Sequence, residues 1–157
     1  MKITFESNLE YQLRAIESVV DIFDGQPIEE TNSYFFLYDD TFFNQIVGIS
    51  NQLVLSEEQI LKNLNEIQKR NNLPLSQNLE GMNFTVEMET GTGKTYVYLR
   101  TIYELNKKYG FKKFVIVVPS IAIREGVLKN LEITFEHFQN LYDKVPVNYY
   151  VYDSSKV

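Results

Sequence analysis

Apolar residues recur along this chain at two different spacings, and the change between them divides the sequence into two parts. In the first part they recur every three or four residues, over residues 8–23 and again over 56–70, which predicts two amphipathic helices. Ser56 and Gln59 form a capping-box pattern at the start of the second helix, because both side chains can satisfy free backbone amides. Residues 31–54 are rich in apolar side chains, but their spacing does not decide between strand and helix.

From residue 83 onward, short apolar runs alternate with longer periodic segments. The short runs predict three strands, at residues 84–88, 114–118 and 147–152. The periodic segments predict helices over residues 95–108 and from residue 120 to about residue 138, the second with Phe135 among its inward-facing side chains. Strands that alternate with helices form parallel sheets, so we expect an α/β fold, a parallel sheet with flanking helices. Because the sequence stops soon after the third strand, we expect the sheet to be truncated there.

Composition narrows the class of protein. The chain has no cysteine, which excludes disulfides and thiolate metal sites. Its longest apolar runs are far shorter than the roughly 20 residues that cross a bilayer, and the amino terminus lacks the apolar stretch of a signal peptide. We therefore expect a cytoplasmic protein with no membrane contact.

The net charge of −6 counts against DNA binding by this chain alone, since a basic face usually supplies that affinity.

A glycine-rich segment, Glu-Thr-Gly-Thr-Gly-Lys-Thr at residues 89–95, lies between the first predicted strand and the helix that follows it. This is the context that a phosphate-binding loop requires, although Met88 stands where the strict pattern has its first glycine. The glycines let backbone amides approach phosphate oxygens, and the helix N-terminus adds its positive dipole end. Lys94 can reach the β- and γ-phosphates of ATP, and the Thr95 hydroxyl can bind Mg²⁺. We therefore predict a site for ATP and Mg²⁺ that is made of Thr90, Gly91, Thr92, Gly93, Lys94 and Thr95. Within this site we expect Lys94 and Thr95 to be catalytic.

Gln12 is a candidate for reading the base of the nucleotide. Its amide offers a donor and an acceptor side by side, which match the N6 and N7 edge of adenine. Taken alone, a glutamine on the wet face of a helix is the simpler interpretation, but the loop downstream favours adenine contact. Gln12 and Lys94 are 82 positions apart (94 minus 12), so an insertion must fill the interval.

Residues 80–98 and 109–120 resemble the Res subunits of type III restriction–modification enzymes, and the likeness is densest from 80 to 130. The segment 89–95 is also similar to the variant loop of superfamily 2 helicases. The resemblance implies a P-loop NTPase with a RecA-like first motor lobe. On this interpretation residues 83–157 begin the ATP-binding lobe, and residues 1–82 form a helical segment with the adenine-contacting motif and an insertion. It further implies an ATP-dependent DNA translocase and endonuclease whose partner is a Mod methyltransferase subunit.

The resemblance also assigns roles outside the loop. Ser120 and Arg124 match positions that grip the DNA backbone. The alternative is a strand–turn–helix in which Ser120 only caps the helix and Arg124 is only solvated, and the resemblance favours the DNA role more for Ser120 than for Arg124. The acidic residues that hold Mg²⁺ in such motors lie beyond the third strand, and Asp153 has no second carboxylate after it. We therefore expect a fragment that binds ATP weakly without appreciable turnover. Two alternatives remain: a small P-loop kinase or other NTPase, and a truncated non-catalytic product that binds nucleotide or Mod.

Overall fold

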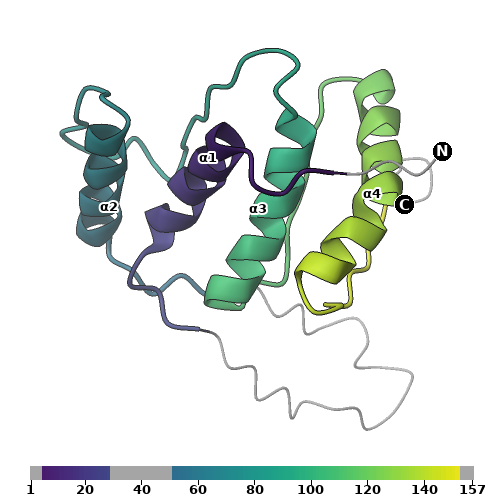
Figure 1. Cartoon of the computed structure of the whole chain (residues 1–157). Coiled ribbons are helices and arrows are strands. Elements are labelled where there is room, and N and C mark those ends of the chain that lie inside the picture. Colours follow the sequence, from purple (N-terminus) through teal and green to yellow (C-terminus); the bar gives the residue numbers. More distant parts are fainter. Residues whose placement is uncertain (1–4, 29–50, 153–157) are drawn as a thin grey trace, which may run out of the picture.

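The computed structural model describes residues 5–28 and 51–152, and in these residues it is helical, with no β-strand (Figure 1). The helices lie in a row, in which α3 packs between α1 and α4 and α2 packs against the short 3₁₀ turn η1 that continues α1. Their bounds are α1 Glu10–Val20, η1 Asp21–Phe23, α2 Glu57–Arg70, α3 Lys94–Tyr109 and α4 Ile121–Leu141. No described helix is both long enough and apolar enough to cross a membrane.

The helix predictions are confirmed, and the signals that predicted them act locally. The Ser56 side chain accepts a hydrogen bond from the Gln59 amide at the start of α2, as a capping box requires. Helix α3 ends at Gly110, whose φ of 75° is the left-handed conformation common just after a helix. Helix α4 runs three residues further than predicted, and Phe138 belongs to its buried face, whereas Phe135, which we expected to point inward, is exposed.

The prediction of an α/β fold with a parallel sheet, and with it the RecA-like lobe, is wrong for this structure. Within the described residues, no backbone–backbone hydrogen bond joins the three segments 84–88, 114–118 and 147–152. Side chains that we expected inside a sheet are in solvent: Val115 is 89% exposed and Val117 is 87% exposed. An apolar run indicates that a segment can form a strand, but a strand is stable only when paired with its neighbours. Residues 29–50 and Asp153, about which we also made predictions, lie outside the described residues.

Three apolar clusters join the helices in sequence. The first lies between α1 and α3 and includes Ile16, Val20, Val97 and Tyr109. The second lies between α3 and α4 and consists largely of rings: Tyr96, Leu99, Tyr103, Phe138 and Tyr142. The third joins α2 to η1 and contains Ile22, Leu55, Ile60 and Ile67. Helix α3 contributes to two of the clusters and is the centre of the packing.

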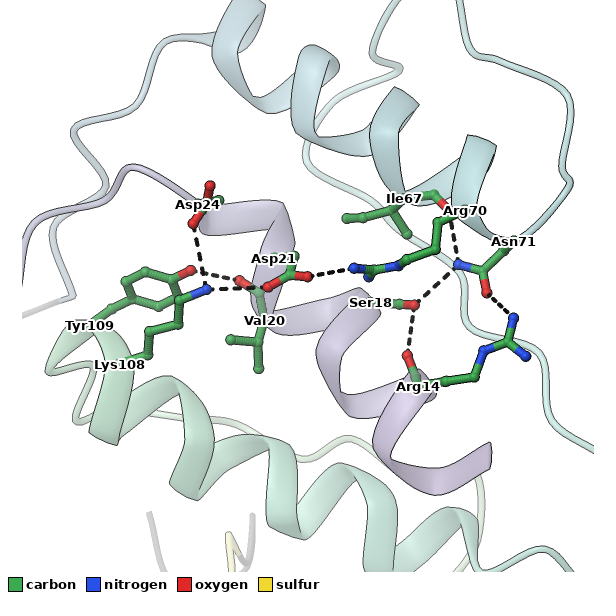
Figure 2. Close-up of polar contacts among 10 residues, drawn as sticks. All are labelled: Arg14, Ser18, Val20, Asp21, Asp24, Ile67, Arg70, Asn71, Lys108 and Tyr109. Atoms are coloured by element: carbon green, nitrogen blue, oxygen red, sulfur yellow. Dashed lines mark hydrogen bonds and ion pairs between the residues drawn. The ribbon is translucent and has the colours of Figure 1, made fainter. Parts of the chain in front are cut away.

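Polar contacts reinforce the junction of α1, α2 and α3 (Figure 2). The Asn71 side chain after α2 accepts a hydrogen bond from Arg14 and donates one to Ser18, both on α1. Asp21 in η1 pairs with Arg70 of α2 at 2.9 Å and with Lys108 of α3 at 3.2 Å. Helix α2 is therefore fixed to the same helix that carries Gln12.

Candidate functional site

The glycine-rich loop leads directly into the N-terminus of α3. Gly91 and Gly93 both have positive φ, 82° and 84°, and Gly93 is the residue that caps α3. The Thr92 hydroxyl donates a hydrogen bond to the Glu89 carbonyl oxygen at 2.7 Å, which closes the loop into a tight turn. The free amides of the first turn of α3 and its positive dipole end therefore lie at the loop, an arrangement that favours anions.

Lys94 is the first residue of α3, and its side chain is folded over the loop. Its Nζ donates hydrogen bonds to the carbonyl oxygens of Met88 and Glu89 at 2.6 and 2.8 Å. The side chain is exposed, so the ammonium group is accessible from solvent. It is an exposed positive charge next to the helix N-terminus.

Gln12 lies directly against this loop. It is only 6% exposed, and its Nε2 donates a hydrogen bond to the Thr92 carbonyl oxygen at 2.9 Å. A Cβ at Gly93 would lie 2.7 Å from the same Nε2, so the glutamine amide packs closely on the loop backbone. Helix α1 brings Gln12 there because its apolar face packs on α3, the helix that the loop begins.

A cavity of about 620 Å³ connects these groups. Its lining contains five of the predicted loop residues together with Gln12: Thr90, Gly91, Gly93, Lys94 and Thr95. The sixth, Thr92, contributes its backbone to the contact with Gln12 and does not line the cavity. The volume lies within the range of about 300–1,000 Å³ that is usual for small-molecule sites.

Five residues that the sequence analysis did not single out complete the cavity wall: Phe5, Glu6, Leu9, Tyr96 and Asn130. A place in the cavity wall could have been inferred for Leu9 and Tyr96, because each lies close in sequence to a predicted site residue. Asn130 comes from the middle of α4 and has no local pattern to mark it; only the packing of α4 on α3 brings it near.

His137 of α4 does not line the cavity, but it contacts two residues that do, Tyr96 and Phe5. Its Nε2 and the Tyr96 hydroxyl lie 2.9 Å apart, and the Phe5 ring contacts both rings. Burial lowers the pKa of His137, and the nearby Arg100 lowers it further.

The residues described contain no group of three or more His, Cys, Asp or Glu side chains that could hold a metal ion. A metal at this cavity would therefore depend on Thr95 and on ligands that arrive with a nucleotide. This donor set fits Mg²⁺, which commonly binds through substrate phosphates and keeps several waters.

Ser120 and Arg124, the predicted DNA contacts, lie at the start of α4 and do not line the cavity. The Ser120 side chain accepts a hydrogen bond from the Ile123 amide and so caps the helix. Arg124 pairs with Glu125 at 3.1 Å on the surface, a type of ion pair that contributes little stability.

The loop, Gln12 and the cavity together define a candidate nucleotide site. Comparison with known proteins shows to which family the chain belongs. The family model described as "Type III restriction enzyme, res subunit" matches residues 7–150. The chain is 33% identical over 158 residues to the EcoPI Res subunit of Escherichia phage P1 and 34% identical over 159 residues to the EcoP15I Res subunit of Escherichia coli. In both cases 98% of this chain is covered, but it spans only 15% of the relative's length. A 63-residue stretch is 52% identical to the StyLTI Res subunit of Salmonella typhimurium, covering 39% of this chain and 6% of that protein.

The chain therefore belongs to the family of type III restriction enzyme Res subunits.

Proposed function

We propose that the cavity binds ATP, with the triphosphate at the glycine-rich loop and the adenine towards Gln12. The observation that carries this proposal is the hydrogen bond from Gln12 to Thr92, which unites a base-reading amide and a phosphate-binding loop in one cavity. These two features are 80 residues apart in the chain. Packing of α1 on α3 for stability alone would not require a polar, buried side chain at this point.

The chemistry of each group follows from its position. Backbone amides of the loop and the first turn of α3 donate to phosphate oxygens. Lys94 exchanges its two carbonyl acceptors for the more negative β- and γ-phosphate oxygens, to which its ammonium group binds more strongly. Mg²⁺, when bound, neutralises phosphate charge, and the Thr95 hydroxyl is the side chain of this cavity that would hold it. In this scheme Lys94 and Thr95 are the catalytic residues and Gln12 selects adenine.

We propose further that ATP binding here serves an ATP-dependent DNA translocase and endonuclease that acts in the cytoplasm with a Mod methyltransferase subunit. The support is the family, because the relatives are named as Res subunits of type III restriction–modification enzymes. Ser120 and Arg124 are the DNA-contacting candidates, since both are on the surface at the start of α4. The net charge of −6 makes DNA contact through this chain alone weak.

Nucleotide titration of the purified chain tests the ATP site. Lys94→Ala removes a charged donor to phosphate and should weaken ATP–Mg²⁺ binding by about 10- to 100-fold, the range of a charge-assisted hydrogen bond. Lys129→Ala is the matched control, because Lys129 is exposed, pairs with Glu132 at 2.8 Å and does not line the cavity. Equal ATP affinity in the wild-type chain and the Lys94 variant would refute the proposed site.

A further inference from the structure

Arg100 is a buried charge on the helix that begins at the glycine-rich loop. It is only 7% exposed, and its guanidinium is bonded on several sides. Nε donates to the Tyr142 hydroxyl at 3.1 Å, and one terminal nitrogen donates to the Ser7 carbonyl oxygen. The Tyr142 hydroxyl in turn donates to the Glu104 carboxylate, which lies 3.9 Å from Arg100. A buried arginine requires such partners, but they do not explain why the chain places a charge here.

The Ser7 contact relates Arg100 to the cavity. Ser7 belongs to residues 5–9, a segment before α1 without regular secondary structure, which supplies Phe5, Glu6 and Leu9 to the cavity wall. Two side-chain contacts hold this segment to α3. Arg100 binds its backbone at Ser7, and the Phe5 ring stacks on Tyr96 with a centroid separation of 5.9 Å.

Helix α3 thereby carries contacts to two parts of the cavity wall, the loop and residues 5–9. Lys94 at its N-terminus belongs to the loop, and Arg100, six positions further along, binds the segment 5–9 that supplies another part of the wall. Arg100 itself does not line the cavity, so its effect on a ligand must pass through residues 5–9.

We propose that Arg100 is a positioning residue that holds residues 5–9 as the base-side wall of the ATP site. The inference rests on the proposed function, because it assigns the wall made by residues 5–9, next to Gln12, to the nucleoside. The proposed role affects binding of the nucleoside and of the triphosphate differently. Loss of Arg100 releases the base-side wall and leaves the phosphate loop intact. A purely structural arginine would instead affect both ends of the ligand together.

Comparison of two ligands on the purified chain tests this inference. Arg100→Met should weaken ATP–Mg²⁺ binding by about tenfold while the affinity for inorganic tripolyphosphate stays within about twofold of wild type. Tyr142→Phe removes the hydroxyl that binds Nε but keeps the ring, so it should produce a smaller loss with the same selectivity for ATP. Hydrogen exchange should also show faster exchange of the amides of residues 6–9 in both variants. Arg70→Met is the matched control, since Arg70 bridges α2 and η1 away from the cavity and should leave both affinities unchanged.

Each other outcome is decisive. Equal loss of ATP and tripolyphosphate binding in a folded variant would overturn the inference and assign Arg100 to general stability. Unchanged ATP binding in the Arg100 variant would overturn it as well. If Arg100→Met fails to fold, Tyr142→Phe decides by the same two criteria. Failure of the wild-type chain to bind either ligand would instead reject the ATP site itself.

Discussion

At the scale of single residues, the two glycines of the loop meet different constraints. Both have a left-handed backbone, which strains any residue with a Cβ. A Cβ at Gly91 would meet nothing within 4 Å, whereas a Cβ at Gly93 would lie 2.7 Å from the Gln12 amide. Gly93 therefore requires both the backbone freedom and the small size of glycine, and Gly91 requires only the first.

Alanine substitutions separate these two requirements. Gly91→Ala should cost about 1–2 kcal/mol in the free energy of unfolding, the strain of a left-handed alanine. Gly93→Ala should cost more and should also weaken ATP binding further, because Gln12 must move from Thr92. Gly126→Ala is the control: it lies within α4 with open space around it, so alanine should stabilise by about 0.5–1 kcal/mol. Denaturant unfolding measures the change in the free energy of unfolding for all three variants. Equal costs at Gly91 and Gly93 would show that the Gln12 side chain moves aside without a cost in stability.

His137 makes a second residue-scale prediction, which concerns pH. Its pKa in the folded chain is lowered from 6.5, first by burial and then by Arg100. As pH falls, the unfolded chain therefore takes up a proton at a higher pH than the folded chain does. The contribution of neutral His137 to the free energy of unfolding is fully present above about pH 6.5 and is lost as pH falls towards the folded pKa. His137→Gln should abolish this part of the pH dependence. Unfolding curves of both chains measured through this range check it, and parallel pH profiles would contradict it.

The residues of the candidate site differ in how readily the sequence reveals them. The loop at residues 89–95 is apparent from the sequence because phosphate binding needs particular residue types at adjacent positions. Gln12 could be proposed only by relating it to that loop. Phe5 and Asn130 could not be predicted, since their places in the cavity wall depend on how the N-terminal segment and α4 pack on α3.

At the scale of elements, the helices could be predicted and the sheet could not. Caps such as Ser56 and Gly110 and a repeat of three to four residues act within one helix, so the sequence alone determines them. Strand pairing joins distant segments, and no property of residues 114–118 reveals whether a neighbour is present. The buried face of α4 was partly misassigned for a similar reason. Phe135 and Phe138 are equally apolar, and the position of α3 decides which is covered.

The attachment of α2 makes an element-scale prediction. Asp21 binds Arg70 and Lys108, but all three side chains are partly exposed, so Asp21→Asn should cost only about 0.5–1 kcal/mol (Figure 2). Ile60 of α2 is fully buried in the cluster that joins α2 to η1, and Ile60→Ala should cost about 2–5 kcal/mol. Denaturant unfolding of the two variants compares these costs. A larger cost for Asp21→Asn would mean that the ion pairs, and not the apolar cluster, hold α2.

At the scale of the whole molecule, an unpaired apolar surface accompanies the acidic charge. The segment 114–118, which has no regular secondary structure, presents Val115 and Val117 almost fully to solvent, and Tyr150 and Val151 are exposed as well. Exposed apolar surface of this kind favours association with another copy, whereas a net charge of −6 opposes association. Salt screens the repulsion between charges but leaves apolar attraction in place.

Self-association of the 157-residue chain should therefore increase with salt concentration and depend on this segment. Replacing Val115 and Val117 together by threonine should reduce association while changing the free energy of unfolding by about 0.5 kcal/mol or less, because neither side chain is buried. Val127→Thr is the control and should destabilise the chain by about 1 kcal/mol or more, since Val127 is in the core. Light scattering at low and high salt measures the association. Undiminished association in the double variant would place the contact elsewhere.

The hydrogen bond from Gln12 to Thr92 also has a consequence for synthesis of the chain. Its partners are separated by 80 residues, so translation at about 5–20 residues per second makes Thr92 roughly 4–16 s after Gln12. During that interval α1 has been made while its partner α3 has not, and the apolar face of α1 lacks its later cover. Helix α2 is made after α1 but before α3, and it can shield η1, which continues α1, before the loop exists. The intervening segment thus provides an early folding partner for the helix that carries Gln12.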